Sequence, residues 1–246
     1  MSGSAAGDAV SGGSLDDQLD DAAVPLVGAD TVPDWLRPLI RRSLGGSYSQ
    51  LRAIRASRRH AENRQSAVLM LLGDGPAGPD LLLTQRAPSM RTHAGQPAFP
   101  GGAIDAGEDS VAAALREGQE ETGVDPSSVT PLVLMPRLHL RVSDFVVQPV
   151  LAYWHRPGPI TAVNSAETAA VARVPIADLV DPAHRIWAQH GSYRGVGFEV
   201  SGMVVWGFTG MLVDALLDLG GWSQRWDYPH TRTVDLAPAA TDLAPS

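Results

Sequence analysis

Four of the seven glutamates in the chain lie within the fourteen residues from 108 to 121. The segment 109–122 has the pattern of a helix, on which Glu117, Glu120 and Glu121 stand at positions i, i+3 and i+4 and project their carboxylates from one face. These carboxylates also occupy the last turns, near the negative end of the helix dipole, where acids are disfavoured. Either compensating cations bind this face, or the face is simply solvated.

The residue types of this cluster indicate which cation would bind. Three carboxylates with no neighbouring His or Cys offer hard oxygen ligands, which suit Mg²⁺ or Mn²⁺ better than Zn²⁺ or copper. Mg²⁺ that is held by few carboxylates usually completes its shell with water and substrate phosphate. The cluster therefore favours the hydrolysis of a phosphate ester or a phosphoanhydride.

The composition excludes several other classes of chemistry. All 19 basic residues are Arg, and the chain contains neither Lys nor Cys, which rules out a Schiff-base lysine, a phosphate-binding Walker lysine, a cysteine nucleophile and a disulfide framework. A net charge of −8 argues against nucleic-acid binding. With no apolar run of 18 residues and a polar N-terminus, the sequence predicts a cytoplasmic protein without a membrane anchor.

The apolar pattern predicts one mixed α/β (α+β) domain at 65–220, preceded by a flexible tail at 1–32 and a helical extension at 33–64, and followed by a mobile C-terminal tail at 221–246. The extension contains a helix from Asp34, as N-cap, to the Gly45-Gly46 stop. The strands expected in the domain are 67–72, 81–85, 99–104, 132–135, 145–154, 197–200 and 203–206. The expected helices are 109–122, 174–180 and 209–219.

One glycine pattern invites a misleading interpretation. Gly73, Gly75 and Gly78 spell GxGxxG directly after an expected strand, as in dinucleotide-binding folds. That motif must open a helix, whereas here Pro76 and Pro79 intervene and a second strand pattern follows. We therefore expect a hairpin with a long Gly/Pro loop.

The string GGAIDAGEDSVAAALREGQEETGV at 101–124 resembles the Nudix box. Its spacing matches at every invariant position, and Gly118 is the one departure, because it stands where the family has an apolar residue. The matching residues are Gly102, Glu108, Arg116, Glu117, Glu120, Glu121, Gly123 and Val124.

A second string, LLTQRAPSMRTHAGQPAFPGG at 82–102, resembles the segment that marks the coenzyme A pyrophosphatase branch of Nudix hydrolases. Further downstream the likeness is looser, and Asp144 stands where a glycine is expected. The residues that carry the upstream match are Leu82, Leu83, Thr84, Arg86, Ala87, Arg91, Gly95, Phe99, Pro100, Gly101 and Gly102.

The resemblance implies an α/β/α sandwich with a mixed central sheet and a role for each matched residue. Glu117, Glu120 and Glu121, with a backbone carbonyl at Gly101 or Gly102, would bind Mg²⁺ or Mn²⁺, and Glu117 could also activate water. Arg116 would orient Glu117 and bridge back to Glu108.

Residues outside the box would contact the substrate. The resemblance places Arg86 and Arg91 on the phosphates, with structural ion pairs as the alternative, and Gly95 in the same binding segment. Glu167, an isolated acid in a loop, is a candidate extra ligand or base.

The implied reaction is hydrolysis of coenzyme A or its thioesters to 3′,5′-ADP and (acyl-)4′-phosphopantetheine. Two alternatives stay open: the same chemistry on ADP-ribose, NADH or a nucleoside triphosphate, and a catalytically silent Nudix domain that binds a ligand. A homodimer is also possible, because Trp222 and Trp226 could serve an interface as well as cover the core.

Overall fold

A mixed nine-stranded β-sheet forms the centre of the computed structural model, which describes residues 22–28, 31–46, 51, 64–90, 93–140, 144–226 and 231–234. Its long middle strand, β2 (Arg64–Gly75), pairs in parallel with β8 (Phe145–Trp154) and antiparallel with β3 (Gly78–Arg86). The other strands extend the sheet in the order β1-β6-β8-β2-β3-β4, with β5 on β2, β7 on β8 and β9 on β3. Their bounds are β1 Val24–Pro25, β4 Pro97–Ala98, β5 Gly101–Ala103, β6 Val129–Leu134, β7 Leu138–Leu140 and β9 Thr168–Pro175.

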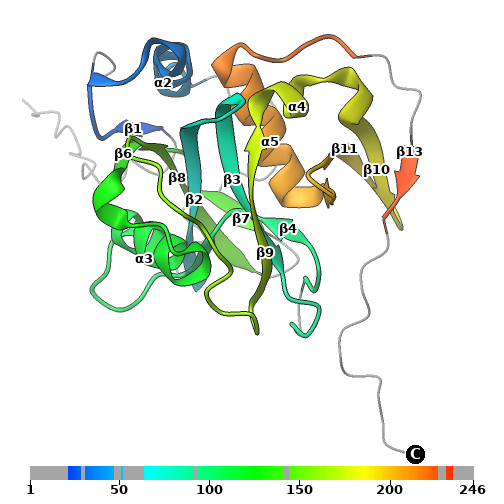
Figure 1. Cartoon of the computed structure of the whole chain (residues 1–246), viewed down its shortest axis with the longest axis horizontal. Helices are drawn as coiled ribbons and strands as arrows, with labels where there is room; N and C mark the ends of the chain where they lie inside the picture. Colours follow the sequence, from blue (N-terminus) through cyan, green and yellow to red (C-terminus); the bar gives the residue numbers. More distant parts are fainter. Residues whose placement is uncertain are drawn as a thin grey trace, which may run out of the picture.

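Both faces of this sheet are covered by helices (Figure 1). Side chains alternate along β2, so that Leu69 packs against α3 (Ser110–Thr122), while Met70 faces the opposite core. That second core is shared by α2 (Arg37–Leu44) and α5 (Gly207–Gly220). The expected three-layer α/β/α arrangement with a mixed sheet is confirmed.

A second, four-stranded sheet lies beside the first and packs on α5 (Figure 1). The hairpin around Ser201-Gly202 is confirmed, and both residues adopt positive φ angles, of 50° and 74°. In sheet order the strands are β12 Met203–Val205, β11 Tyr193–Val200, β10 Arg185–His190 and β13 Thr231–Thr233.

Several local expectations need correction. The Gly/Pro hairpin is confirmed, but β2 and β3 extend through it and leave a two-residue turn in place of a long loop. The helix expected at 174–180 is confined to α4 (Ile176–Val180), because Val174 and Pro175 end strand β9. Asp34 is not an N-cap, since a 3₁₀ turn at Asp34–Leu36 precedes α2.

Segments expected to be tails contribute to the fold. Strand β1 pairs with β6, and β13 pairs in parallel with β10 although it lies within the expected C-terminal tail. Trp222 packs against Trp35 at a ring-centroid distance of 5.9 Å, and Trp226 packs against Trp187 at 5.6 Å. Trp222 therefore covers the chain's own core, and Trp226 packs on the four-stranded sheet.

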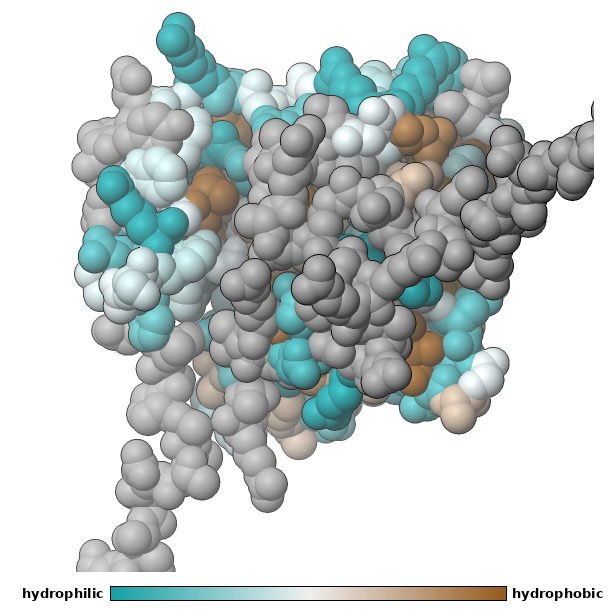
Figure 2. All heavy atoms as spheres, turned by 180° about the vertical axis from the view of Figure 1, so that it is seen from behind, coloured by the Kyte–Doolittle hydropathy of each residue, from teal (hydrophilic) through white to brown (hydrophobic). Residues whose placement is uncertain are grey.

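The surface of the described part of the chain offers no large apolar face. In Figure 2 the hydrophobic residues drawn in colour form small patches that are separated by hydrophilic residues. Large hydrophobic side chains that are exposed belong to separate elements, and none of the described helices is long and apolar enough to cross a membrane.

Candidate active site

The helix α3 carries the acidic cluster, and its ends are fixed as the sequence predicts. The Asp109 carboxylate accepts a hydrogen bond from the backbone N–H of Ala112 at 2.8 Å, which satisfies an N–H group that has no partner within the helix. At the other end Gly123 adopts a left-handed conformation with φ 74°. Ala113 and Ala114 are buried against the sheet on the same side of the helix as Glu117 and Glu121, one to two turns earlier, so the acidic cluster continues the packed side of α3 and Glu121 is itself buried.

Gly118, the one departure from the box, lets α3 lie close to the sheet. A Cβ atom at this position would lie 2.7 Å from Cδ2 of Leu69, whose side chain is fully buried. The side chain of Leu69 thus fills the volume that an apolar residue at position 118 would occupy. The departure is compensated by packing and does not disturb the charged residues.

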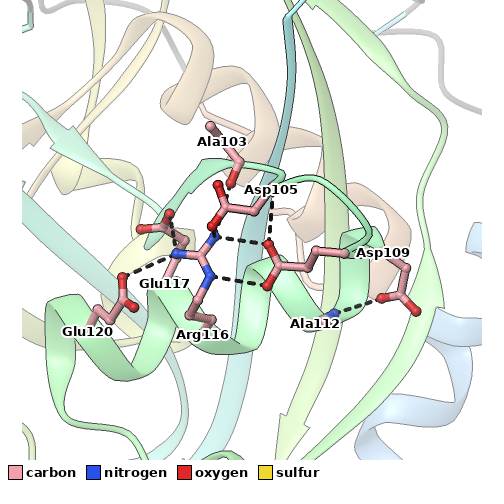
Figure 3. A network of polar contacts seen from close by, with 8 residues as sticks. Ala103, Asp105, Asp109, Ala112, Arg116, Glu117 and Glu120 are labelled. Atoms are coloured by element: carbon pink, nitrogen blue, oxygen red, sulfur yellow. Dashed lines mark hydrogen bonds and ion pairs between the residues drawn. The ribbon is translucent and has the colours of Figure 1, made fainter.

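Arg116 connects the acidic residues of the helix to the loop before it (Figure 3). Its guanidinium donates two hydrogen bonds to the Glu108 carboxylate, both at 3.1 Å, and one to the carbonyl of Ala103 at 3.0 Å. The same group donates to Glu117 at 2.9 Å and to Glu120 at 3.2 Å. The predicted bridge from Arg116 to Glu108 is therefore present.

Electrostatics around Arg116 stabilise its charged state. Hydrogen bonding from Arg116 lowers the pKa of Glu108, and the bonds to Glu108 and Glu117 raise the pKa of Arg116. This network fixes the loop 104–109 against α3 and holds two carboxylates of the cluster on one cation.

Glu121 is the most deeply buried acid of the cluster, with 8% of its surface exposed. Burial raises its pKa to about 7; the negative charges of Glu117 and Glu167 add to the effect, while Arg86 and a hydrogen bond from the Gly101 N–H oppose it. Burial also raises the pKa of Glu117, and repulsion by Glu120 and Glu167 contributes. The site therefore holds more negative charge than its surroundings neutralise.

Glu167 reaches this site because its loop is attached to the end of α3. Backbone N–H groups of Thr161 and Val163 donate to the carbonyls of Thr122 and Glu121, and Glu167 itself accepts a hydrogen bond from the N–H of Ala87 at 2.7 Å. Directly after it, β9 contains a bulge opposite Gln85 and Arg86. Bulges of this kind redirect a strand, and this one carries Glu167 toward α3.

Sequence reasoning missed Asn164, which shapes the Glu167 turn. Its side chain accepts a hydrogen bond from the N–H of Ala166, and its carbonyl accepts bonds from Glu167 and Thr168. The Asn-Ser-Ala sequence that precedes Glu167 is typical of a turn in which an Asn side chain binds the backbone two residues later. That signal could have identified the residue.

Arg86 is the cation on the sheet side of the cluster. It ends strand β3, and its charge lowers the pKa of Glu121. Among the described residues its Nε atom, which is hidden from solvent, has no hydrogen-bond partner, and no ion pair involves its guanidinium. Arg86 therefore retains the capacity to bind an anion beside the carboxylates.

The two glycines of the FPGG string permit close approach, each to a different group. A Cβ on Gly101 would lie 2.4 Å from the carbonyl oxygen of Ala67, within the strand pair β5–β2. A Cβ on Gly102 would lie 2.2 Å from Oε1 of Glu117. Gly101 is thus required by the sheet, and Gly102 leaves room for the Glu117 carboxylate.

The model of the NUDIX domain family matches residues 63–193, which include α3, the Glu167 loop and the strands of the main sheet other than β1. The chain belongs to the Nudix hydrolase family.

Curated relatives agree with this assignment, and similar solved structures are also found. The chain is 35% identical over 189 residues to the uncharacterized Nudix hydrolase NudL of Cronobacter sakazakii, with 71% of this chain and 92% of the relative covered. It is also 35% identical over 178 residues to NudL of Klebsiella pneumoniae, with 66% and 86% covered. A Nudix hydrolase from M. smegmatis, RenU, is 18% identical with a TM-score of 0.47, over 67% of this chain and 90% of that chain.

The Nudix-box carboxylates are not arranged as a finished metal site. Among the described residues no group of three or more His, Cys, Asp or Glu side chains is placed to hold a metal ion, and Arg116 engages both Glu117 and Glu120. The donor set itself fits a hard divalent cation: three carboxylates on one helix face, two of them with raised pKa values. For Glu120 to join Glu117 and Glu121 on a cation, its side chain would have to turn away from Arg116.

Other residues that the resemblance singled out lie away from the acidic cluster or outside the residues that the structure describes. Arg91 falls outside the described residues. Gly95 adopts a φ of 69° in the turn before β4 and accepts a hydrogen bond from Gln85, so it is not part of the acidic cluster. Asp144, where the pattern has glycine, has a φ of 57°, which explains the glycine preference and which Asp tolerates better than most residues.

Proposed function

We propose that this Nudix hydrolase is a divalent-metal-dependent pyrophosphatase that cleaves coenzyme A or its thioesters to 3′,5′-ADP and (acyl-)4′-phosphopantetheine. The observation that carries the proposal is the convergence of Arg86, Glu117, Glu121 and Glu167, which come from three separate segments of the chain. A cation with unused donors beside an excess of carboxylates suits a pyrophosphate that is bound together with a metal ion.

Each residue has a distinct part in this proposal. Glu117, Glu120 and Glu121, with a carbonyl at Gly101 or Gly102, would hold Mg²⁺ or Mn²⁺, which would neutralise charge on the phosphates and lower the pKa of a bound water. The Glu120 side chain is 58% exposed and can rotate toward the cation without unpacking the core. Arg116 would then keep Glu117 and Glu108 in place through the bonds that it already makes.

Arg86 and Glu167 would act on the substrate side. The guanidinium of Arg86 would bind a phosphate oxygen, a task that Arg performs with fixed geometry. Glu167 would serve as base or as an additional ligand, since its charge already acts on both Glu117 and Glu121.

The choice of coenzyme A is supported by the second signature and by its position. The string 82–102 folds into β3, β4 and β5, and these strands bring Arg86, Gly101 and Gly102 to α3. These three residues are among those that carry the resemblance to the coenzyme A branch.

An anion-exchange assay tests the reaction, the substrate and the metal together. Coenzyme A, ADP-ribose, NADH and dATP are each incubated with the protein and Mg²⁺ or Mn²⁺, with Glu120→Gln as the control variant. We expect 3′,5′-ADP from coenzyme A with the wild type alone. Hydrolysis confined to another compound would reassign the substrate, and activity that Glu120→Gln leaves unchanged would remove the acidic cluster from the mechanism.

A further inference from the structure

A second cavity of about 370 Å³ lies between the main sheet and the four-stranded sheet. Its walls come from β3, the turn before β4, β12, the residue before α5 and β13. The residues with polar or aromatic groups that bear on its chemistry are Gln85, Gln96, Trp206 and Arg232. This volume is at the lower end of the range for ligand pockets, which suits a small molecule.

The cavity is separate from the acidic cluster because the two sites lie on opposite faces of β3. Side chains alternate along a strand, and the extra residue of the adjacent bulge lies on β9, so the alternation of β3 is undisturbed. Arg86 is directed to the face that carries Glu121, whereas Gln85 is directed to the cavity. A ligand in this cavity would therefore not occupy the acidic site.

An indole ring is held in the cavity wall by two other rings. The Trp206 ring lies 5.7 Å from the ring of His190 and 5.7 Å from the ring of Tyr193, measured between centroids. His190 is fixed in turn by a hydrogen bond of 2.8 Å to the carbonyl of Val234, another wall residue. An indole that is supported in this way can pack against a planar ligand at little cost in side-chain entropy.

Two glutamine amides in the wall retain unused hydrogen-bonding capacity. Gln85 donates through Nε2 to the carbonyl of Gly95 at 3.3 Å, and Gln96 contacts His93 through Oε1 at 2.9 Å. Within the described part of the chain, the Oε1 of Gln85 and the Nε2 of Gln96 have no partner. One acceptor and one donor are thus available to the edge of a heterocyclic base.

Arg232 supplies the positive charge of the cavity. One of its N–H groups is paired with Glu199, and a guanidinium has five, so donors remain for an anionic group. Arg232 lines the cavity and its side chain is 52% exposed, so a ligand can reach the charge from solvent.

From an indole, an amide oxygen and an amide nitrogen without partners and a guanidinium around one small cavity, we infer that this region binds a nucleoside monophosphate. The base packs against Trp206 with its edge at Gln85 and Gln96, and the phosphate lies at Arg232. No metal ion and no bond cleavage are involved, so the inference is independent of the proposed reaction.

Calorimetric titration of AMP into the full chain, in EDTA so that no divalent cation supports turnover, tests this site. We expect one saturable site for AMP. Arg232→Gln should lower the affinity about tenfold, because a charge-assisted hydrogen bond is lost, and Trp206→Leu should lower it by a similar factor, because stacking is lost. Thermal melts establish that both variants fold. Adenosine should respond to Trp206→Leu alone, and inorganic phosphate to Arg232→Gln alone.

Two control variants locate the binding. Arg194→Gln removes an exposed arginine of the same sheet that packs on Trp187, outside the cavity, and should leave the affinity unchanged. Glu120→Gln should bind AMP as the wild type does. No saturable binding, equal affinity in all the variants, or loss of binding only in Glu120→Gln would overturn the inference.

Discussion

Replacing Glu121 by Gln should stabilise the metal-free protein at pH 8, although the change removes a proposed metal ligand. The pKa of this carboxyl rises from 4.5 to about 7 on folding, chiefly because burial disfavours the charged form. The folded chain therefore binds more protons than the unfolded chain between these two pH values. Stability falls as the pH rises through this window and is lowest above it.

The size of the effect follows from the same two values. The difference between 4.5 and about 7, at roughly 1.36 kcal/mol per pH unit, amounts to about 3 kcal/mol. Glutamine keeps a carbonyl oxygen for the N–H of Gly101, so the variant loses the charge without losing the acceptor. We expect Glu121→Gln to raise the free energy of unfolding by up to about 3 kcal/mol at pH 8.

Urea denaturation in EDTA at pH 4 and at pH 8 measures this difference. At pH 4 the two proteins should be nearly equal, since the wild-type carboxyl is then protonated. Glu108→Gln is a control of opposite sign, because Arg116 lowers the pKa of Glu108 and its charge stabilises the fold at pH 8. A Glu121→Gln variant that is no more stable than the wild type at pH 8 would refute the reasoning.

Three further substitutions separate the fold from the site. Gly102→Ala should fold normally yet lose activity, because the new Cβ displaces only the flexible end of Glu117; melting curves and turnover measure the two effects. Gly101→Ala should instead destabilise the fold, since its Cβ meets the backbone of Ala67, and urea denaturation detects this loss. Glu120→Gln should lower kcat by about 100-fold or more while changing the melting temperature little in EDTA, because this side chain is mostly exposed. If Mg²⁺ raised the melting temperature of Glu120→Gln as much as that of the wild type, Glu120 would not be a ligand.

The parts of the fold that the sequence predicted are those fixed by local signals. Helix α3 has a side-chain cap at Asp109 and a left-handed Gly123. Strand β8 is an apolar run that only Gln148 and Pro149 interrupt, and its bounds agree with the expected 145–154. Strands β9 and β10 were not predicted. The apolar residues of β9 are mostly alanines and those of β10 form a run of three, which are weak strand signals, and both segments are strands because β3 and β11 pair with them.

The candidate site, too, could be predicted from the sequence only where local signals fix it. Helical periodicity alone places Glu117, Glu120 and Glu121 on one face. The approach of Glu167 and Arg86 depends on a bulge and on loop hydrogen bonds between segments far apart in the chain, and a single sequence carries no signal for either. The engagement of Glu120 by Arg116 was likewise not foreseen.

The contact between Gly118 and Leu69 also couples these two positions. A larger residue at 118 overlaps Leu69, and a smaller residue at 69 with Gly118 retained leaves a cavity, so either change alone costs stability. The usual apolar residue is accommodated best at 118 when residue 69 is shortened as well. Placing the family's usual apolar residue at 118 alone would lower the stability of this protein, although the substitution looks conservative when position 118 is considered by itself.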